Sequence, residues 1–385
     1  MAEYDFSAVV AAAKELRWQI HSHPELSNNE SETTRRIADF LEAHNLRFHR
    51  FVGGLHGGYV KIDVGAAKTV CFRADIDALP IVENTGLKAA SEVPGVMHAC
   101  GHDMHTSIAA GLALALSQNK EKLRWNVVIL FQPAEESNPR GGAKPLIEQG
   151  FLREESITGI YGLHVWPSYP VGTIGVRSGA LMGSSDKMQI VVHGKGSHAA
   201  EPQNGIDAIS IAADIVNGVV HKLRREIDPF DVCLATIGAI HSVGRYNVLC
   251  DQVVLEGTIR AASPEARTLY HARIRELASG IAACYGGTAE VAIADGYHVV
   301  LNEPVQTEQF IAFAKRHLGE RHVDTALHPS LIGEDFSFFT EQVPSTYFFM
   351  GCNSPYPLHS DRFYPQEETL ETAVRLMTGF FLDSL

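Results

Sequence analysis

The chain has 385 residues, of which 45% are hydrophobic and 20% charged, and its formal net charge is -13 with histidine neutral. A chain of this length usually folds as two domains, and this composition is typical of a soluble globular protein. The acidic balance and the lack of a stripe of lysine and arginine argue against nucleic acid and against a membrane surface as partners. No apolar stretch reaches the length of a transmembrane span.

Residues 1–18 carry acidic residues where a signal peptide needs basic ones, and their apolar run is short. They predict the amphipathic helix of a cytoplasmic protein. The six cysteines lie far apart and form no close pair, which favours free thiols over disulfides. They are Cys71, Cys100, Cys233, Cys250, Cys284 and Cys352.

The first half of the chain alternates helical and strand patterns. Helical spacing of apolar residues covers 5–22 and 30–44. Short apolar runs predict four strands, at 58–64, 69–75, 126–133 and 159–165, with a further helix between the second and the third. Three of these strands end in polar residues, in RADID, QPAEE and LHVWP. Because ligands bind beyond the carboxyl ends of strands in open α/β sheets, these ends predict a site.

The pattern changes after residue 183. Strand and helix patterns then follow in the order β-α-β-β-α-β up to residue 296, which predicts a two-layer unit of ferredoxin-like type. From about residue 300 the pattern returns to that of the first half. We therefore expect an α/β fold with a mixed-sheet domain formed by residues 1–183 and 297–385. A smaller α+β domain is expected as an insertion at 184–296.

The densest chemistry lies in HACGHDMHTS, residues 98–107. Cys100 and His102 are separated by one glycine, and a loop can turn both toward one point. With Asp103 beside them, a thiolate, an imidazole and a carboxylate would repel or stay unsatisfied without a cation, which favours a metal site. A cysteine nucleophile is the alternative, but it does not explain a second strand end rich in carboxylates.

That second strand end is FQPAEES, where Glu135 and Glu136 are adjacent. Neighbouring residues of an extended chain point in opposite directions, so one carboxylate can bind metal while the other acts as a general base. His164 ends an apolar run, and His359 lies in a polar loop near the C-terminus. Two metal ions that share one ligand would fit the set Cys100, His102, Glu136, His164 and His359.

These segments resemble the co-catalytic metallopeptidase family of aminoacylases, hippurate hydrolases and plant auxin-amino-acid conjugate hydrolases. The matching stretches lie in family order from about residue 17 to residue 360 and so cover nearly the whole chain. They include RWQIHSHPELSNNESETT, FRADIDALPI, MHACGHDMHTS, FQPAEE, GLHVWP, GKGSHAAEPQNGIDAI, GTIRA, GEDFSFF and LHS.

The resemblance implies a catalytic domain that binds two divalent ions through the five residues named above. It implies that the inserted domain acts as a lid and provides the contact surface between the subunits of a homodimer or homotetramer. Glu135 would be the general base, and His198 of the inserted domain would donate to the oxyanion. Arg73 stands where the wider superfamily has a metal-binding histidine, as in the aminoacylase branch. Asp75 would then orient a metal-bound histidine, and Asp103 is also expected behind the ligands.

The substrate class implied by the resemblance is an N-acyl-L-amino acid, with an aromatic acyl group, as in hippurate, or an acetyl group. Its carboxylate needs a fixed cation, for which Arg260 at the end of a predicted strand is the candidate. Asn247 is a lesser candidate beside it. Glu334 and Asp335 of GEDFSFF are expected to line the same cleft or to support the metal ligands, without an assigned role.

The sequence thus predicts a metal-dependent amidohydrolase that cleaves N-acyl-L-amino acids to a carboxylic acid and a free amino acid. One alternative is a deacetylase for N-acetyl-diaminopimelate or for another amino-acid conjugate. A second alternative is a metal-free binding protein on the same fold, although the intact Glu135 argues against it. A third is a hydrolase with a cysteine nucleophile. Thiolate and imidazole ligands suit zinc, and the mixed set also admits manganese, cobalt or nickel.

Overall fold

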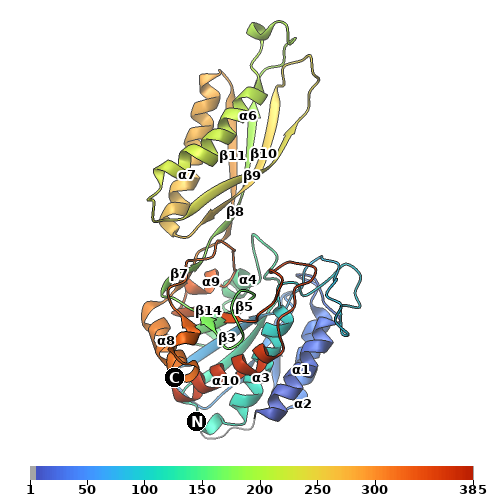
Figure 1. Cartoon of the computed structure of the whole chain (residues 1–385), viewed down its shortest axis with the longest axis vertical. Helices are drawn as coiled ribbons and strands as arrows, with labels where there is room; N and C mark the ends of the chain where they lie inside the picture. Colours follow the sequence, from blue (N-terminus) through green and yellow to red (C-terminus); the bar gives the residue numbers. More distant parts are fainter. Residues whose placement is uncertain (1–5, 385) are drawn as a thin grey trace. The chain divides into compact units, whose positions relative to one another are not determined.

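The computed structural model describes residues 6–384, and their chain contacts divide into two units (Figure 1). The first unit contains the chain up to Leu181, together with Leu301–His328 and the chain from Asp335 onwards. The second contains Met182–Val300 and Pro329–Glu334. Within the described range, no helix combines the length and the apolarity that a membrane crossing requires.

Eight strands form the sheet of the first unit, in the order β1-β2-β4-β3-β5-β14-β6-β13. The strands β4, β3, β5 and β14 lie next to one another and are parallel, whereas β1, β2 and β6 pair antiparallel, so the sheet is mixed as expected. The four parallel strands are buried along almost their whole length, which explains their continuous apolar runs. The bounds are β1 Phe48–Arg50, β2 Gly58–Ile62, β3 Thr69–Asp75, β4 Asn126–Gln132, β5 Ile157–Trp166, β6 Ile174–Gly175, β13 Val323–Asp324 and β14 Ser345–Gly351.

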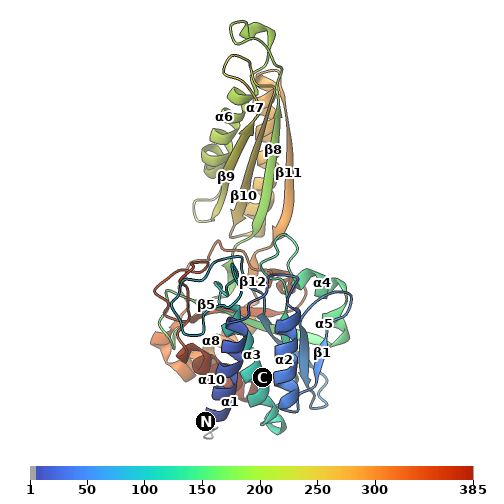
Figure 2. The same cartoon turned by 90° about the vertical axis from the view of Figure 1, so that its right-hand side faces the viewer.

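Helix α3 packs on this sheet, and α1 and α10 pack on α3 (Figure 2). Every residue of α3 except the last is buried, as expected of an apolar helix covered on several sides. The first residue of the helix expected at 5–22 lies outside the described residues. The helices of this unit are α1 Ser7–His21, α2 Ser31–Ala43, α3 His102–Ser117, α4 Ala143–Glu148, α5 Phe151–Glu154, α8 Pro304–Leu318, α9 Ser337–Thr340 and α10 Glu368–Asp383, with 3₁₀ turns η1 Lys120–Lys122 and η5 Glu320–His322.

Four antiparallel strands form the sheet of the second unit, in the order β11-β8-β10-β9. In chain order the elements are β8, α6, β9, β10, α7 and β11, which confirms the expected β-α-β-β-α-β sequence. The two helices and the sheet enclose a hydrophobic core that is separate from the core of the first unit. The bounds are β8 Ser185–His193, α6 Ala208–Asn217, β9 Cys233–Ser242, β10 Gln252–Ala261, α7 Pro264–Cys284 and β11 Thr288–Tyr297, with the short turns η2 Pro202–Asn204, η3 Gly218–Lys222 and η4 Leu223–Glu226.

A small two-stranded sheet pairs β7 (Gly179–Met182) with β12 (Val300–Asn302). These strands hold the points at which the chain enters and leaves the long segment of the second unit, at residues 181–182 and 300–301. The second unit is thus an insertion whose two ends belong to neighbouring strands.

Candidate metal centre

The predicted site residues lie at the carboxyl ends of the parallel strands. Asp75 is the last residue of β3, and Glu135 and Glu136 follow the end of β4 after a short turn. His164 stands near the end of β5. Because β3, β4 and β5 run parallel, these ends meet at one edge of the sheet, where α/β proteins bind ligands.

The loop before α3 adds the thiol and a second imidazole. Gly101 has a φ of 85°, and a Cβ there would lie 2.6 Å from Cγ2 of Val165, so only glycine fits between Cys100 and His102. His359 comes from a distant loop, but its backbone N–H donates to the carbonyl of Ala99 at 2.9 Å. This bond fixes the C-terminal loop beside the cysteine.

Two groups of donor atoms form around one sulfur. Cys100 Sγ lies 3.3 Å from Nε2 of His164 and 3.3 Å from Nε2 of His359. Glu136 Oε1 in turn lies 3.3 Å from Nε2 of His359. The donor atoms within 4.8 Å of one another are Cys100, His102 and His164 in one group and Cys100, Glu136 and His359 in the other. The thiol belongs to both groups, so the structure brings the five predicted ligands together around a shared cysteine.

The histidines are held with one ring nitrogen turned to the centre. Nδ1 of His102 lies 3.1 Å from Oδ1 of Asp77, and its buried Nε2 has no hydrogen-bond partner among residues 6–384. Nδ1 of His164 lies 2.8 Å from the carbonyl of Val165, which leaves Nε2 to face Cys100. A buried ring nitrogen without a partner is costly in a folded protein, and a divalent ion would satisfy it. The donor set therefore fits metal.

The charges around these donors also favour a bound cation. Burial, together with the carboxylates of Glu136 and Glu135, raises the pKa of the Cys100 thiol well above its ordinary value. Burial alone would lower the pKa of His102, but Asp75 and Asp77 outweigh it and raise that pKa to about 10. The carboxylates thus favour positive charge at this place, and metal would provide it while binding the thiol as thiolate.

The two glutamates are directed differently by the backbone. Ala134 has a φ of 58°, a left-handed conformation that is strained for alanine and that recurs at functional sites. Its N–H donates to Oε1 of Glu30 at 2.7 Å, and the N–H of Glu136 donates to Oδ2 of Asp77 at 2.9 Å. Glu135 is buried beside Glu136, and its Oε1 accepts the backbone N–H of Asp335 at 3.4 Å. Glu136 forms a donor group with Cys100 and His359, and both glutamates also lie with His102 in a further group of possible ligands.

Asp75 lies near two histidines and makes its short contact with His105. The carboxylate that reaches His102 at hydrogen-bond distance is Asp77, whereas Asp75 Oδ1 lies 3.7 Å from Nδ1 of that ring. Asp75 instead contacts Nδ1 of His105 at 2.6 Å, and Nε2 of His105 accepts the N–H of Val165 at 2.9 Å. Asp75 is thus linked through His105 to the backbone of β5 next to His164.

Arg73 and Asp335 form a buried cluster behind the glutamates. Arg73 binds Asp75 through Nη1 at 2.7 Å and Asp335 through Nη2 at 2.5 Å. Asp335 also accepts bonds from Gln132 Nε2 and from the backbone N–H of Gly142 at 2.8 Å each. Arg73 is therefore a structural cation, and Asp335 holds the turn after β4. Glu334, its neighbour in sequence, is buried and is assigned to the second unit.

Asp103 lies in the first turn of α3, directly after His102. Its Oδ2 accepts a bond from Nε of Arg17 at 3.0 Å and contacts Nδ1 of His21 at 3.0 Å. Burial alone would raise its pKa, but Arg17 and His21 hold it well below the ordinary range. His98 is buried nearby, and burial lowers its pKa to about 4. Asp103 therefore fixes the start of α3 as an anion.

The remaining candidates belong to the second unit. The N–H of Ala199 donates to the carbonyl of Asn247 at 3.1 Å, and His198 pairs with Val248 in an isolated bridge. His198 and Asn247 are thus exposed on neighbouring segments. Arg260 is half-buried on β10, and burial lowers the pKa of its guanidinium. None of the three takes part in the donor groups.

Two residues of this centre, Asp77 and His105, were not identified from the sequence. Asp77 stands two residues after Asp75 in FRADIDALPI, and the alternation of an extended chain would place both carboxylates on one side. His105 belongs to the stretch HACGHDMHTS and lies near the start of α3. Its contact with Asp75 depends on the rotation of α3 about its axis, for which the sequence holds no pattern.

Thiol, imidazole and carboxylate donors at the edge of a mixed α/β sheet, with a second carboxylate beside them, are the donor set of a metal-dependent hydrolase. The model of the peptidase family M20/M25/M40 matches residues 71–383. The chain belongs to this family, which confirms the metallopeptidase resemblance of its motifs.

Relatives and a solved structure agree over nearly the full length. An uncharacterized hydrolase of Sinorhizobium fredii, y4tI, is 39% identical over 387 residues, covering 97% of this chain and 94% of the relative. An N-acetyldiaminopimelate deacetylase of Listeria monocytogenes is 36% identical over 367 residues, covering 95% and 97%. The YXEP protein of Bacillus subtilis, described as a dinuclear metal binding peptidase from the M20 family, superposes with a TM-score of 0.87 at 33% identity, covering 98% of each chain.

Proposed function

We propose that the protein hydrolyses the amide bond of N-acyl-L-amino acids and releases a carboxylic acid and a free amino acid. The observation that carries this proposal is the placement of Glu135 beside two donor groups that share Cys100. When bound, two divalent ions at these groups supply polarisation of an amide carbonyl and a water of lowered pKa.

The residues of the first unit divide the remaining work. Cys100 joins the two halves of the centre, with His102 and His164 on one side and Glu136 and His359 on the other. Glu135 accepts the proton of the attacking water and returns it to the leaving amine nitrogen. Its burial and the N–H of Asp335 fix the carboxylate for this transfer.

Substrate contacts are proposed for the second unit. A tetrahedral oxyanion requires donors, and His198 offers an exposed imidazole for this role. Arg260 is a half-buried cation suited to a bidentate bond with the substrate carboxylate, and Asn247 offers an amide. Residues 184–296 would act as the lid over the catalytic domain formed by residues 1–183 and 297–385.

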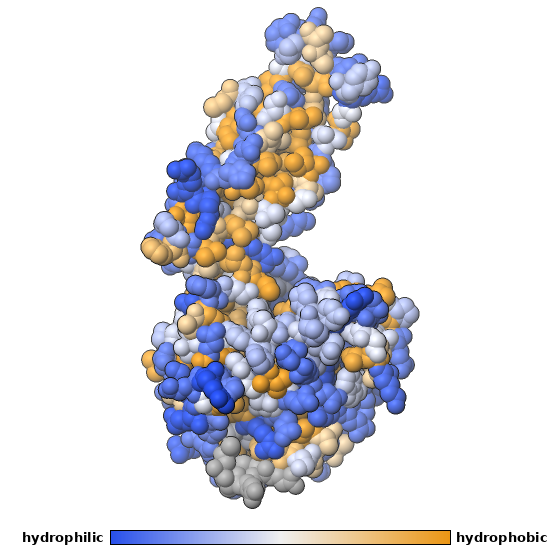
Figure 3. Space-filling view, in the orientation of Figure 1, coloured by the Kyte–Doolittle hydropathy of each residue, from blue (hydrophilic) through white to orange (hydrophobic). Residues whose placement is uncertain are grey.

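A homodimer or homotetramer through this lid is part of the proposal. Strand β9 is an edge strand of the four-stranded sheet, and apolar side chains on it and after it are exposed. Leu234 and Ile240 lie on the strand, and Val243 and Tyr246 follow it, with Val243 92% exposed. Figure 3 shows apolar surface over much of the face of the second unit that it draws. An exposed apolar edge is a surface for strand pairing with a second copy, and a monomer by sedimentation at micromolar concentration would contradict this proposal.

The identity of the metal and the cellular compartment are also part of the proposal, and the donor atoms and the cysteines support them. Thiolate and imidazole donors suit zinc, while manganese, cobalt and nickel accept the same mixed set. All six cysteines are free and five of them are buried, which fits a reducing cytoplasm.

A second candidate function is deacetylation of N-acetyl-diaminopimelate. The 36% identity to an enzyme of that name over 95% of the chain supports it, and the donor groups serve both reactions. The two functions differ in the substrate side chain, which carries a second charged centre in diaminopimelate. A metal-free binding protein on this fold is disfavoured, because the donor groups and Glu135 are assembled.

One experiment separates these functions. The rate of amino-acid release is measured for N-acetyl-, N-benzoyl- and longer N-acyl-L-amino acids and for N-acetyl-diaminopimelate, each with a chelator and with added zinc or manganese. Metal-dependent cleavage of simple N-acyl amino acids supports the leading proposal, and cleavage of the diaminopimelate derivative alone supports the second. Cleavage that resists chelation but stops on thiol alkylation would assign Cys100 as a nucleophile. No cleavage of any compound would refute both hydrolase proposals.

A further inference from the structure

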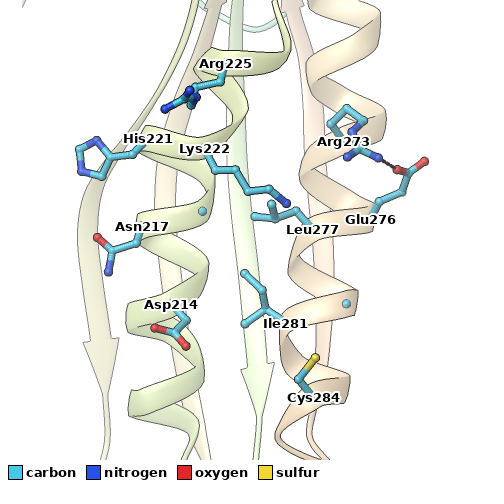
Figure 4. A pocket seen from close by; sticks show the side chains of 12 residues that line it. Asp214, Asn217, His221, Lys222, Arg225, Arg273, Glu276, Leu277, Ile281 and Cys284 are labelled. Carbon is cyan, nitrogen blue, oxygen red and sulfur yellow. Dashed lines mark hydrogen bonds and ion pairs between the residues drawn. The ribbon is translucent and has the colours of Figure 1, made fainter.

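Glu30 is a buried carboxyl group that the proposed reaction does not use. Charged side chains mostly lie at protein surfaces. An example here is the groove of about 900 Å³ between α6 and α7 of the second unit, where Arg273 pairs with the exposed Glu276 (Figure 4). Glu30 is instead 0% exposed, although it stands at the start of α2. Because a buried carboxyl group needs polar partners, its contacts indicate what it does.

Glu135 and Glu136 are the two central residues of a tight turn. The carbonyl of Ala134 accepts the N–H of Ser137 at 3.2 Å, which closes the turn around the two glutamates. Ala134 has a φ of 58°, a conformation that an alanine keeps only where its surroundings hold it. The direction of Glu135 therefore depends on the contacts that fix the backbone of Ala134.

The loop before α2 contacts this turn at both ends. Oε1 of Glu30 accepts the N–H of Ala134 at 2.7 Å. At the other end of the turn, Nδ2 of Asn28 donates to Oγ of Ser137 at 3.3 Å. The first bond is buried and the second is exposed, and a hydrogen bond is stronger where water is excluded. Glu30 therefore provides the main restraint from this loop.

Glu30 is itself held in place by its neighbours. Its carbonyl accepts the N–H of Thr34 at 2.9 Å and the hydroxyl of Thr34 at 2.5 Å. That hydroxyl oxygen in turn accepts the N–H of Gly57 at 2.7 Å. Burial and the charge of Asp77 raise the pKa of the Glu30 carboxyl to about 7. A neutral carboxyl still offers an acceptor to Ala134, and so does an amide of the same length.

We propose that Glu30 is a positioning residue for the general base: it holds the backbone of Ala134 and thereby directs the carboxylate of Glu135. The inference rests on the proposed function, in which Glu135 accepts the proton of the attacking water. The N–H of Asp335 holds the end of the Glu135 side chain at 3.4 Å, and Glu30 holds the backbone before it. Because Glu30 is fully buried, it acts through the backbone and not on the substrate.

Two variants separate the reach of the Glu30 side chain from its charge. Glu30→Gln keeps the length and the acceptor, so its kcat should stay close to that of the unaltered protein. Glu30→Asp keeps the charge but is shorter by one methylene, so it should lose the bond to Ala134. Its kcat should fall about 10- to 100-fold, because a small displacement of a reacting group costs that much. Aspartate is a preferred residue at the start of a helix, so α2 should remain folded.

The measurements distinguish a displaced base from a damaged fold. In the metal-loaded, full-length protein, kcat and KM are measured with the N-acyl-L-amino acid that is cleaved fastest. The metal content is measured by elemental analysis, and the melting temperature verifies that each variant is folded. We expect Glu30→Asp to change kcat while KM and the metal content stay as they are in the unaltered protein.

Glu25→Asp is the matched control in the same loop. Its carboxylate accepts the N–H of Thr33 at 2.7 Å and that of Glu32 at 3.2 Å. Glu25 therefore holds the start of α2, as Glu30 does, but its hydrogen bonds do not reach the turn at Ala134. Shortening Glu25 should leave kcat unchanged.

Hydrogen exchange tests the same contact without any reaction. In the full-length protein without substrate, the peptide that covers residues 131–138 should exchange faster in Glu30→Asp, because the N–H of Ala134 loses its acceptor. The same peptide should exchange as in the unaltered protein in Glu30→Gln and in Glu25→Asp. Mass spectrometry of peptides measures the exchange.

Four results would overturn the inference. An unchanged kcat in Glu30→Asp would show that the bond to Ala134 does not direct the base. An equal loss in Glu30→Gln would assign the effect to charge, and an equal loss in Glu25→Asp would assign it to α2 as a whole. Loss of metal from Glu30→Asp would place the effect on the ligand Glu136. If the unaltered protein cleaves no N-acyl amino acid, the proposed function fails, whereas the exchange still decides whether Glu30 holds the turn.

Discussion

Asp77 contacts both donor groups of the metal centre. Its Oδ1 lies 3.1 Å from Nδ1 of His102, and its Oδ2 accepts the N–H of Glu136 and the hydroxyl of Ser27. Burial alone would raise its pKa, but the bond to His102 and its charge lower it, so the group is an anion. One buried carboxylate thus orients an imidazole of one group and the backbone that carries the carboxylate of the other.

We therefore expect Asp77→Asn to weaken metal binding about 10- to 100-fold, as is typical when the partner of a metal-bound histidine is lost. Competition with a chromogenic chelator measures the affinity. Ser27→Ala is the matched control, because it removes a single bond to the same carboxylate. An unchanged affinity in Asp77→Asn would mean that His102 needs no such partner.

Glu135→Gln should retain metal and lose activity. The amide keeps the size of the side chain but cannot take a proton from water, so we expect kcat to fall about 10²- to 10⁴-fold. Metal content by elemental analysis and kcat by amino-acid release are measured together. Glu136→Gln is the control and should lose metal as well as activity. More than a tenth of the original kcat in Glu135→Gln would exclude Glu135 as the base.

At the scale of residues, the sequence predicted which side chains meet but not all of their contacts. Glu136 and His164 stand in motifs at the ends of parallel strands, which meet at one edge of the sheet, whereas Cys100 and His102 lie at the start of α3 and His359 lies in a loop. Which carboxylate contacts which histidine depends on the exact direction of each side chain, and the sequence does not give that direction. Asp75 and Asp77 share a motif and a side of the chain, so no pattern separates the one that binds His102 from the one that binds His105.

At the scale of elements, a buried cluster joins the end of α1 to the start of α3. His21, the last residue of α1, contacts Asp103 at 3.0 Å and Glu83 at 3.3 Å. Arg17 and His98 also face this cluster. Burial alone would lower the pKa of His21, but the carboxylates outweigh it and raise that pKa to about 9. The imidazolium therefore stabilises the helix pair at neutral pH.

This cluster gives stability a pH dependence. Because the pKa of His21 is higher in the folded chain, its contribution is complete below about pH 6.5 and is lost as the pH rises through about 9. His21→Gln should lower the free energy of unfolding by up to about 3 kcal/mol at pH 6, and the deficit should vanish near pH 10. Thermal unfolding at both pH values measures it, with the exposed His44→Gln as control. A deficit that persists at pH 10 would show a packing effect instead.

The periodicity of the sequence predicted whether each element is a helix or a strand more accurately than it predicted the residues at which the element begins and ends. The helix expected at 30–44 is α2, Ser31–Ala43, and the strand expected at 69–75 is β3. The strand expected at 159–165 extends from Ile157 to Trp166, because β3 and β14 pair along it on both sides. The π-helical turn after Asn217 was not predicted, since its residues keep the apolar spacing of an ordinary helix.

At the scale of the whole molecule, two separate hydrophobic cores let the units be tested apart. The core of the first unit draws on the chain before residue 182 and after residue 300, and the core of the second lies between them. The chain contacts divide the units near residues 182 and 300, where the strand and helix pattern of the sequence also changes. Such patterns do not predict which residues contact the substrate.

We expect the first unit to keep its metal when residues 183–299 are replaced by a short glycine-serine linker. The linker joins β7 to β12, which are neighbours in one sheet. If the substrate is positioned by the second unit, hydrolysis should fall by about 10²-fold or more, because positioning contributes at least that much to such reactions. Metal content and kcat/KM are measured against the full chain. Unchanged kcat/KM would assign all substrate contacts to the first unit.

The order of the donors along the chain has a consequence for synthesis. Cys100, Glu136 and His164 leave the ribosome before the second unit, whereas His359 follows the long segment of that unit, Met182–Val300, by almost sixty residues. A nascent chain therefore exposes an incomplete set of donors while the second unit, with its own core, can already fold. The group of Cys100, Glu136 and His359 can close only when translation is nearly finished. Full metal loading should thus be a late event of biogenesis, after both units have left the ribosome.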